Sequence, residues 1–141
     1  MITWDYNNKH NNMSLSNNNL TASYSGNSWG AIRATNGKNK GKWYWEIIID
    51  NFTDSHVEGI GTEDSPLYPS AGSAGTGFRL YRPHNHNNYG LIIDNQYGIS
   101  PEWGTVYVGN GEVVGLALNI DEGYIDYYKN SEYLGRAFND I

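Results

Sequence analysis

The chain has 141 residues, a length that suits one domain, and aromatic residues make up 14 % of it within a hydrophobic total of 38 %. The formal net charge of −6 argues against nucleic acid as a partner, because phosphate binding requires a basic surface. The sequence has no cysteine, which excludes disulfides and thiolate chemistry.

The sequence shows no pattern typical of export or of membrane insertion. The first residues, MITWDYNNKH, lack a basic stretch followed by an apolar run, so we expect no signal peptide. No window approaches the roughly 18 consecutive apolar residues of a membrane-spanning helix. We therefore expect no membrane insertion.

Turn-forming residues are frequent, with 17 Gly and even more Asn, while Lys and Arg together number only 9. Asn and Gly tolerate left-handed backbone and favour turns, whereas aromatic and β-branched residues favour strands. This composition predicts an all-β fold, and we expect residues 1–141 to form a single domain.

The Asn-rich segment 1–24 comes first. Met13, Leu15 and Leu20 recur there at strand-like spacing, so we expect an N-terminal strand and a surface loop. The remaining residues, 25–141, are expected to form the core of the domain.

The next two elements are expected to form a hairpin. The segment AIRATNGKNKGK contains Asn36-Gly37 and Gly41, which supply positive-φ positions for a tight connection. It leads into a strand over 42–50, GKWYWEIIID, whose alternation separates two faces. The face predicted to point into the core carries Trp43, Trp45, Ile47 and Ile49.

The middle of the chain is rich in loops. VEGIGTED reads as a short strand whose two glycines indicate a bulge or a close backbone approach. Residues 65–77 form a long loop, and long ordered loops are often functional. FRLYR and YGLIIDN read as strands that flank the polar loop PHNHNN.

The last third predicts a β-meander with two short turns, Asp121-Glu122-Gly123 and Lys129-Asn130-Ser131-Glu132. A third strand is expected to begin at Tyr133-Leu134. The inward positions of the first two strands are predicted to be Val114, Leu116, Leu118, Ile120, Ile125 and Tyr127.

Patterns that could carry chemistry are weak. His84 and His86 have the i, i+2 spacing that aims two imidazoles at one metal, but no Asp, Glu or Cys adjoins them, so a polar loop is favoured. The pairs Glu63-Asp64 and Asp121-Glu122 are adjacent turn residues, unlike the separated carboxyls of a glycosidase, although Glu46 with Asp126 remains open.

Two further catalytic patterns are missing. The glycine-rich stretch after residue 58 lacks the Lys-Ser or Lys-Thr ending of a phosphate loop. No Gly-x-Ser-x-Gly sequence supports acyl transfer. We therefore expect no enzymatic activity and no cofactor.

The aromatic residues divide into two groups. Alternation places Trp43 and Trp45 in the core rather than in a sugar-stacking platform. Trp29 and Tyr68 each lie in a predicted loop, where they either contact a partner or cap one end of the core.

The ordered segments GKWYWEI, VEGIGT and GEVVGLALNIDEGYIDYYKNSEYLGRAF resemble a SPRY domain, and the resemblance covers roughly residues 25 to 141. It implies a bent antiparallel sandwich of two sheets with a binding rather than a catalytic role. The GKWYWE sequence in its Asn-rich surroundings is more similar to the phage and bacterial members.

The chain departs from the family pattern at three places. Ser131 stands where the turn usually has Gly, so we expect a positive φ there at a modest energetic cost. Asn119 stands where Asp is common. The sequence stops at Ile141, before the final strands of the family, which implies either a truncated sequence or an incomplete sandwich. In the second case we expect a sheet edge that another chain complements.

The resemblance also implies where a partner binds, in the loop before the AIRAT strand and the loop after the GIGT strand. The residues concerned are Ser25, Asn27, Ser28, Trp29, Thr62, Glu63, Asp64, Ser65, Pro66, Leu67 and Tyr68.

The function expected from these observations is recognition of proteins. The specific hypothesis is a structural protein of a phage or virus, located in the virion, oligomeric, and contacting other subunits or a host surface. One alternative is a carbohydrate-binding module, and another is an intracellular adaptor that binds a peptide.

Overall fold

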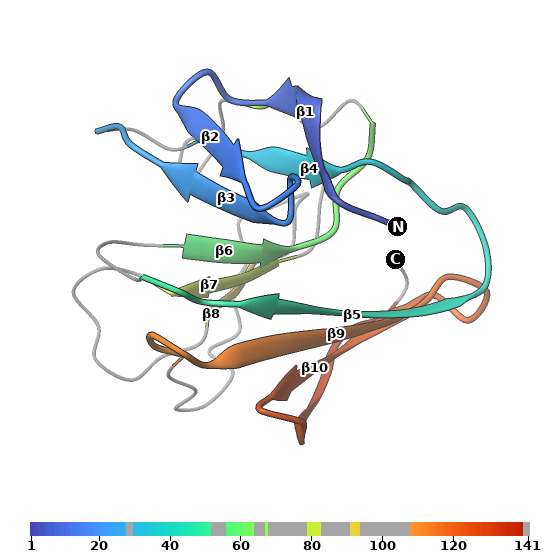
Figure 1. The fold of residues 1–141 in the computed structure, drawn as a ribbon. Coiled ribbons are helices and arrows are strands. Elements are labelled where there is room, and N and C mark those ends of the chain that lie inside the picture. The colour runs from blue at the N-terminus through green and yellow to red at the C-terminus, as the bar shows by residue number, and fades with distance from the viewer. Residues whose placement is uncertain are drawn as a thin grey trace. The chain divides into compact units, whose positions relative to one another are not determined.

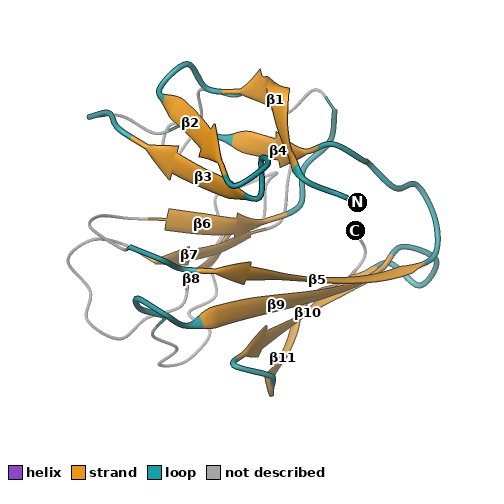
Figure 2. Ribbon diagram, viewed as in Figure 1, coloured by secondary structure: helices purple, strands orange, loops and turns teal. Residues whose placement is uncertain are grey.

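The computed structural model describes residues 1–27, 30–51, 56–63, 67, 79–82, 91–93 and 108–139. Every regular element in these ranges is a strand, every strand pair is antiparallel, and the all-β prediction is therefore confirmed (Figures 1 and 2). No helix in the described ranges could cross a membrane. The strands are β1 (Trp4–Lys9), β2 (Met13–Ser16), β3 (Thr21–Tyr24), β4 (Ile32–Ala34), β5 (Lys42–Ile48), β6 (His56–Gly59), β7 (Arg79–Arg82), β8 (Leu91–Ile93), β9 (Val113–Asn119), β10 (Tyr124–Lys129) and β11 (Glu132–Asn139).

The chain forms two compact units. The first comprises Met1–Lys38 with Gly61–Thr76, and the second comprises Asn39–Ile60 with Gly77–Ile141. In the first unit β1 pairs with β4 and β2 pairs with β3. The second unit contains a four-stranded sheet in the order β11-β10-β9-β5 and a three-stranded sheet in the order β6-β7-β8.

The Asn-rich segment 1–24 contains the strands β1, β2 and β3, whereas the sequence pattern predicted only one. The β2–β3 connection explains the run of asparagines, because Asn17, Asn18 and Asn19 all have positive φ, at 51°, 53° and 62°. Asn is among the few non-glycine residues that adopt this conformation readily. The asparagines therefore close a hairpin and are not a long surface loop.

The hairpin expected between the AIRAT strand and the WYWE strand is wrong. β4 pairs with β1, while β5 pairs with β9 through a register in which Trp45 lies opposite Leu116. The connection over residues 35–41 is too long for the two-residue turn that the Asn36-Gly37 signal indicates. The backbone of β5 is instead hydrogen-bonded to β9, which lies far along the sequence.

The C-terminal meander β9-β10-β11 is present as predicted. Its second turn has Asn130 at φ 48° and Ser131 at φ 68°, so the expected positive φ at Ser131 is confirmed. In the first turn the Asn119 Oδ1 atom accepts a hydrogen bond of 3.1 Å from the Glu122 backbone N–H. The Asn119 Nδ2 atom is buried and has no partner among the described residues.

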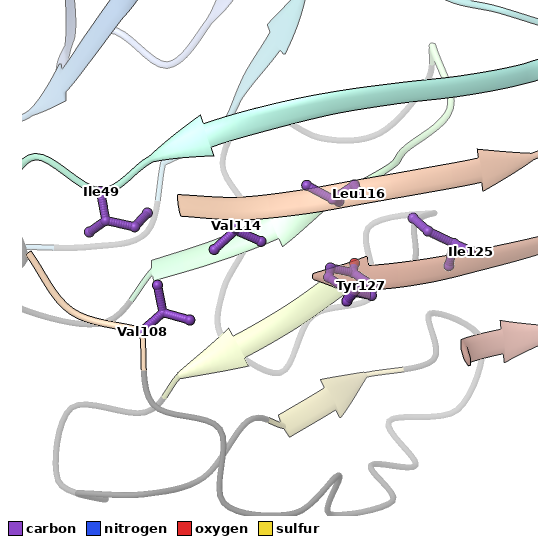
Figure 3. Packing of buried hydrophobic residues seen from close by; sticks show 6 residues of the cluster. All are labelled: Ile49, Val108, Val114, Leu116, Ile125 and Tyr127. Atoms are coloured by element: carbon purple, nitrogen blue, oxygen red, sulfur yellow. The ribbon is translucent and has the colours of Figure 1, made fainter. Parts of the chain in front are cut away.

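The core of the second unit lies on one face of the four-stranded sheet. Tyr127 is fully buried, and its hydroxyl donates a hydrogen bond of 3.2 Å to the Glu58 carbonyl, which joins β10 to β6. Trp45, Ile47 and Leu118 are half-buried and pack against this cluster. Figure 3 shows the six buried side chains together: Ile49, Val108, Val114, Leu116, Ile125 and Tyr127.

Two residues expected in the core are placed differently. Trp43 is 38 % exposed, and its indole N–H donates a hydrogen bond of 2.8 Å to the Lys40 carbonyl at the start of β5. Ile120 is half-buried and lies outside the buried cluster, because β9 ends at Asn119 and the turn that follows interrupts the alternation. The prediction therefore identifies the inward face of β5 and β9 correctly. It extends that face one residue too far, to Trp43 at the start of β5 and to Ile120 after the end of β9.

Candidate recognition surface

The first candidate loop follows β3 in the first unit. Ser25 and Asn27 are exposed, and the Ser25 backbone N–H donates a hydrogen bond of 3.1 Å to the Asn12 carbonyl. Asn12 in turn donates its backbone N–H to Nδ1 of His10, at 2.9 Å. Hydrogen bonds to the β1–β2 connection thus fix the chain where it leaves β3.

His10 and Tyr24 pack against one another next to the start of this loop. His10 is 5 % exposed, and its ring meets the Tyr24 ring edge-on with centroids 5.5 Å apart. Glycines on both sides of the loop allow close packing, since a Cβ at Gly26 would lie 2.6 Å from the Tyr24 hydroxyl and a Cβ at Gly30 would lie 2.9 Å from His10 Cγ. A side chain at residue 26 or 30 would therefore force the Tyr24 or His10 ring to shift.

The second candidate loop returns to the same region of the first unit. The Leu67 carbonyl accepts a hydrogen bond of 3.0 Å from the Ala31 backbone N–H. The Ala31 carbonyl accepts one of 2.8 Å from the His10 backbone N–H. These bonds link Leu67 of the second loop to Ala31, which follows the first loop, and link Ala31 to His10, which follows β1. We name residues 25–29 and 62–68 the loop pair.

The described members of the loop pair suit a contact surface. Ser25, Asn27, Thr62 and Glu63 are exposed, and Leu67 is half-buried. Loops held on a rigid scaffold are common binding sites, because their side chains are free while their backbone is fixed. The residues predicted for binding or metal that lie outside the described ranges are Ser28, Trp29, Asp64, Ser65, Pro66, Tyr68, His84 and His86.

The carboxylates considered for catalysis have structural partners. Asp121 Oδ1 accepts a hydrogen bond of 2.9 Å from the Gly41 N–H, and Glu122 pairs with Lys42 at 3.4 Å. Asp126 binds Arg136 through both carboxylate oxygens, at 2.9 and 3.3 Å. Within the described residues, His, Asp and Glu form no group of three that could hold a metal ion.

A second surface feature was not identified from the sequence, and it lies in the second unit. The outer face of the four-stranded sheet, opposite the core, carries a groove of about 310 Å³. Its lining includes Tyr44 of β5, Ala117 of β9, and Tyr124, Asp126 and Tyr128 of β10. We name this feature the tyrosine groove.

Two contacts define the chemistry of the tyrosine groove. The Tyr44 hydroxyl donates a hydrogen bond of 2.9 Å to Glu46 Oε1, and desolvation together with this carboxylate raises the pKa of the Tyr44 phenol. Tyr44 therefore remains a neutral donor at physiological pH. Asp126, which lines the groove, accepts hydrogen bonds from Arg136, and these bonds raise the pKa of the Arg136 guanidinium, which keeps its charge.

One signal in the sequence could have indicated the tyrosine groove. Tyr44 and Glu46 alternate on β5 in the same way that Tyr124, Asp126 and Tyr128 alternate on β10, so both strands carry aromatic and acidic residues on the face opposite the core. A solvated sheet face rarely needs so many rings.

Comparisons with known proteins agree with this architecture. A sequence model of the SPRY domain matches residues 42–141. A dual specificity protein kinase, splA of Dictyostelium discoideum, is 29 % identical over 114 residues, which cover 79 % of this chain and only 5 % of the kinase. The chain thus spans a small fraction of that curated relative.

Solved structures show the same fold. The SPRY domain of human HERC1 matches with a TM-score of 0.72 at 16 % identity, covering 97 % of this chain and 81 % of that domain. The PSpry domain of TRIM65 matches with a TM-score of 0.71 at 14 % identity, covering 97 % and 77 %. At these identities the likeness concerns the fold alone.

Proposed function

The chain belongs to the SPRY domain family, and from this premise we propose that its loop pair binds a partner protein. SPRY domains are typically protein–protein interaction modules and are generally not catalytic. The observation that supports the proposal is the hydrogen bond from the Ala31 N–H to the Leu67 carbonyl, which joins the residue shortly after the first loop to a residue of the second loop within one unit.

The rigidity of the support is what makes the loop pair suitable. Binding fixes side chains and loops, and this loss of freedom weakens association unless the surface is already ordered. His10 is buried, accepts the Asn12 N–H through Nδ1 and packs against Tyr24, so it supports the chain where the first loop leaves β3. Exposed Thr62 and Glu63 add polar groups that can give specificity at the rim of a contact.

Photo-crosslinking tests this proposal directly. A photoreactive residue at Ser25 or Thr62 should crosslink to a defined partner in extracts of the producing cell, because both positions face solvent in the loop pair. The matched control is Lys38, which is exposed in the same unit but outside the loops. Equal crosslinking of the same proteins from Lys38 would contradict the proposal.

The narrower proposal is that this SPRY domain is a phage or virus structural protein that assembles into the virion. It is supported by the resemblance of GKWYWE and its Asn-rich surroundings to phage and bacterial members. Purified particles should then contain the chain in a constant ratio to the major structural protein. Its absence from particles would refute the virion location and leave protein recognition by the loop pair intact.

An oligomer formed through strand addition is a further proposal. β11 is one of the two outer strands of the four-stranded sheet among the described strands, the other being β5, and an outer strand can pair with a strand of another chain. Analytical ultracentrifugation should detect an oligomer. Hydrogen–deuterium exchange of this oligomer should show that the β11 amides exchange slowly with solvent. A monomer whose β11 amides exchange slowly would contradict strand addition.

A further inference from the structure

The charges around the tyrosine groove do not cancel. Lys42 pairs with Glu122 at 3.4 Å, and Arg136 pairs with Asp126 at 2.9 Å, so these four side chains neutralise each other. The exposed Glu46 carboxylate has no basic partner among the described residues, and the Tyr44 hydroxyl is the group that donates to it. One negative charge therefore remains next to Tyr44, which lines the groove.

Three tyrosine rings lie in a row beside this carboxylate. The rings of Tyr44 and Tyr128 meet at 86° with centroids 5.8 Å apart, and those of Tyr128 and Tyr133 meet at 55° with centroids 5.3 Å apart. Tyr44 is 52 % exposed and Tyr133 is 54 % exposed, so ring faces are accessible to a partner. The faces of aromatic rings carry partial negative charge and attract cations.

The same sheet face already binds one guanidinium group. Arg136 lies over the Tyr124 ring with its Cζ atom 3.4 Å from the ring centroid, and it bonds to both oxygens of Asp126. A planar guanidinium stacks on an aromatic face while its N–H groups bind a carboxylate. Tyr44, Tyr128 and Glu46 supply the same two elements, a ring and a carboxylate, and no arginine of the described residues pairs with Glu46.

We propose that the tyrosine groove binds an arginine side chain presented by an extended segment of a partner protein. The guanidinium stacks on the Tyr44 ring, next to the edge-on Tyr128 ring, and pairs with Glu46. This inference rests on the proposed function in taking the partner to be a protein, and it adds a second surface and the chemistry that this surface recognises. A neutral glycan would stack on the rings but would leave the charge of Glu46 unmatched.

Small residues keep the groove open. Ala117 lines it, and Gly115 lies beneath the Tyr44 hydroxyl. A Cβ at residue 115 would overlap the Tyr44 hydroxyl and would lie 3.1 Å from Tyr128 Cβ. A glycine at this position thus leaves room for the Tyr44 hydroxyl above β9, where it meets Glu46, the β5 residue opposite Gly115.

Titration with model peptides tests the inference. The probe is a capped peptide of alternating glycine and arginine, followed by NMR of the intact chain. We expect it to shift the amide signals of Tyr44, Ala117 and Tyr128 first. The matched peptide with citrulline, which is isosteric but neutral, should leave these signals unchanged, and the lysine peptide should bind more weakly because an ammonium group does not stack.

Variants locate the site. Glu46→Gln and Tyr44→Ala should each weaken arginine-peptide binding about threefold to fivefold, the range expected for one exposed charge pair or one cation–π contact. Asp50→Asn is the control for net charge, because it removes one exposed carboxylate outside the groove. Tyr6→Ala is the control for an exposed tyrosine, since Tyr6 is 67 % exposed in the other unit.

Gly115→Ala gives an independent test without deleting a ring or a charge. The added methyl should displace the Tyr44 hydroxyl from Glu46 and weaken binding by a similar factor. A denaturation curve of the variant shows whether it is folded. If Gly115→Ala does not fold, Tyr44→Ala and Glu46→Gln still decide the question.

Three outcomes would overturn the inference. The first is equal binding of the arginine and citrulline peptides, and the second is equal weakening by Glu46→Gln and Asp50→Asn, which would indicate non-specific attraction to an acidic protein. The third is a sugar such as galactose shifting the groove signals while the arginine peptide does not. None of these results affects the loop pair, which is tested separately by crosslinking at Ser25 and Thr62.

Discussion

The inner and outer faces of the four-stranded sheet use the same kinds of side chain for different purposes. On β10, Tyr127 is fully buried and donates its hydroxyl to the backbone of β6, whereas its neighbour Tyr128 packs among half-exposed rings on the other face. On β5, Trp45 packs against the core while Tyr44 faces solvent. Aromatic content alone therefore does not distinguish the buried face from the exposed face. The hydrogen-bond partner of each tyrosine hydroxyl does distinguish them.

The inner face is a packed interior. Val114, Leu116 and Ile125 are fully buried, and the polar group among them, the Tyr127 hydroxyl, is hydrogen-bonded. A buried polar group without a partner would destabilise the fold, so the bond to Glu58 is needed. The outer face retains exposed rings and an exposed carboxylate, which contribute little to folding.

Truncation of the inner face should have the largest effect. Leu116→Ala removes a fully buried side chain and should lower the free energy of unfolding by about 3 kcal/mol, since the site cannot fully collapse. Chemical denaturation measures this change. The control is Ile48→Ala at a site that is 62 % exposed, where a loss below about 1 kcal/mol is expected. Similar losses in both variants would contradict the difference between the faces.

A smaller effect is expected from removing a single hydroxyl. Tyr127→Phe leaves the Glu58 carbonyl without this donor and should lower the free energy of unfolding by about 1 kcal/mol. Tyr44→Phe removes the exposed bond to Glu46 and should change stability by less than about 0.5 kcal/mol. If the two variants lost equal stability, the buried hydroxyl would have no special role.

Acid should weaken the contacts that the Glu112 carboxylate makes with Gly109 and Lys129. Glu112 is partly desolvated, which opposes ionisation, but the Gly109 N–H at 2.7 Å and Lys129 Nζ at 3.0 Å outweigh this and hold the Glu112 pKa below its usual value. The stabilisation is therefore present above the unfolded pKa, near 4.5, and is lost as pH falls through the folded pKa.

Denaturation at a series of pH values checks this expectation. The unfolding free energy of the wild-type chain should fall more steeply below about pH 5 than that of Glu112→Gln, which carries no titrating group at this position. Lys129→Met should reduce the steepness in the same direction, because it removes the charge that favours ionised Glu112. If both variants kept the wild-type pH profile, Glu112 would not contribute to the acid sensitivity of the fold.

The smallest effect concerns the β10–β11 turn. Ser131 has φ 68°, a conformation that glycine adopts without strain, so Ser131→Gly should raise the free energy of unfolding by about 0.5 kcal/mol. Ser14→Gly is the control, because Ser14 lies in β2 without positive φ and should lose about 0.5 kcal/mol. A loss of stability in Ser131→Gly would show that the serine side chain contributes more than the backbone strain removes.

Regular alternation made part of this structure predictable. Val114, Leu116, Ile125 and Tyr127 follow a period of two because one face of a half-buried strand must be apolar. Trp43 follows the same period yet is exposed, since alternation identifies a face and not how far the covering residues extend along it. Its indole N–H also finds the Lys40 carbonyl outside the core.

Long-range pairing could not be predicted from local patterns. The Asn36-Gly37 signal describes a turn, but the partner of β5 is β9, which lies far along the sequence. The strands β1 to β3 were underestimated because their asparagines and serines resemble a loop, while positive φ at Asn17 to Asn19 closes a hairpin. The contact of Leu67 with Ala31 likewise depends on the fold, although the family resemblance had indicated both loops.

The most direct test of the division between the two faces is arginine-peptide titration of Tyr127→Phe and Tyr44→Ala, monitored by NMR. The account predicts that Tyr127→Phe, while folded, binds the peptide as the wild-type chain does, and that Tyr44→Ala binds about threefold to fivefold more weakly. Wild-type binding by Tyr44→Ala, or loss of binding by folded Tyr127→Phe, would contradict it.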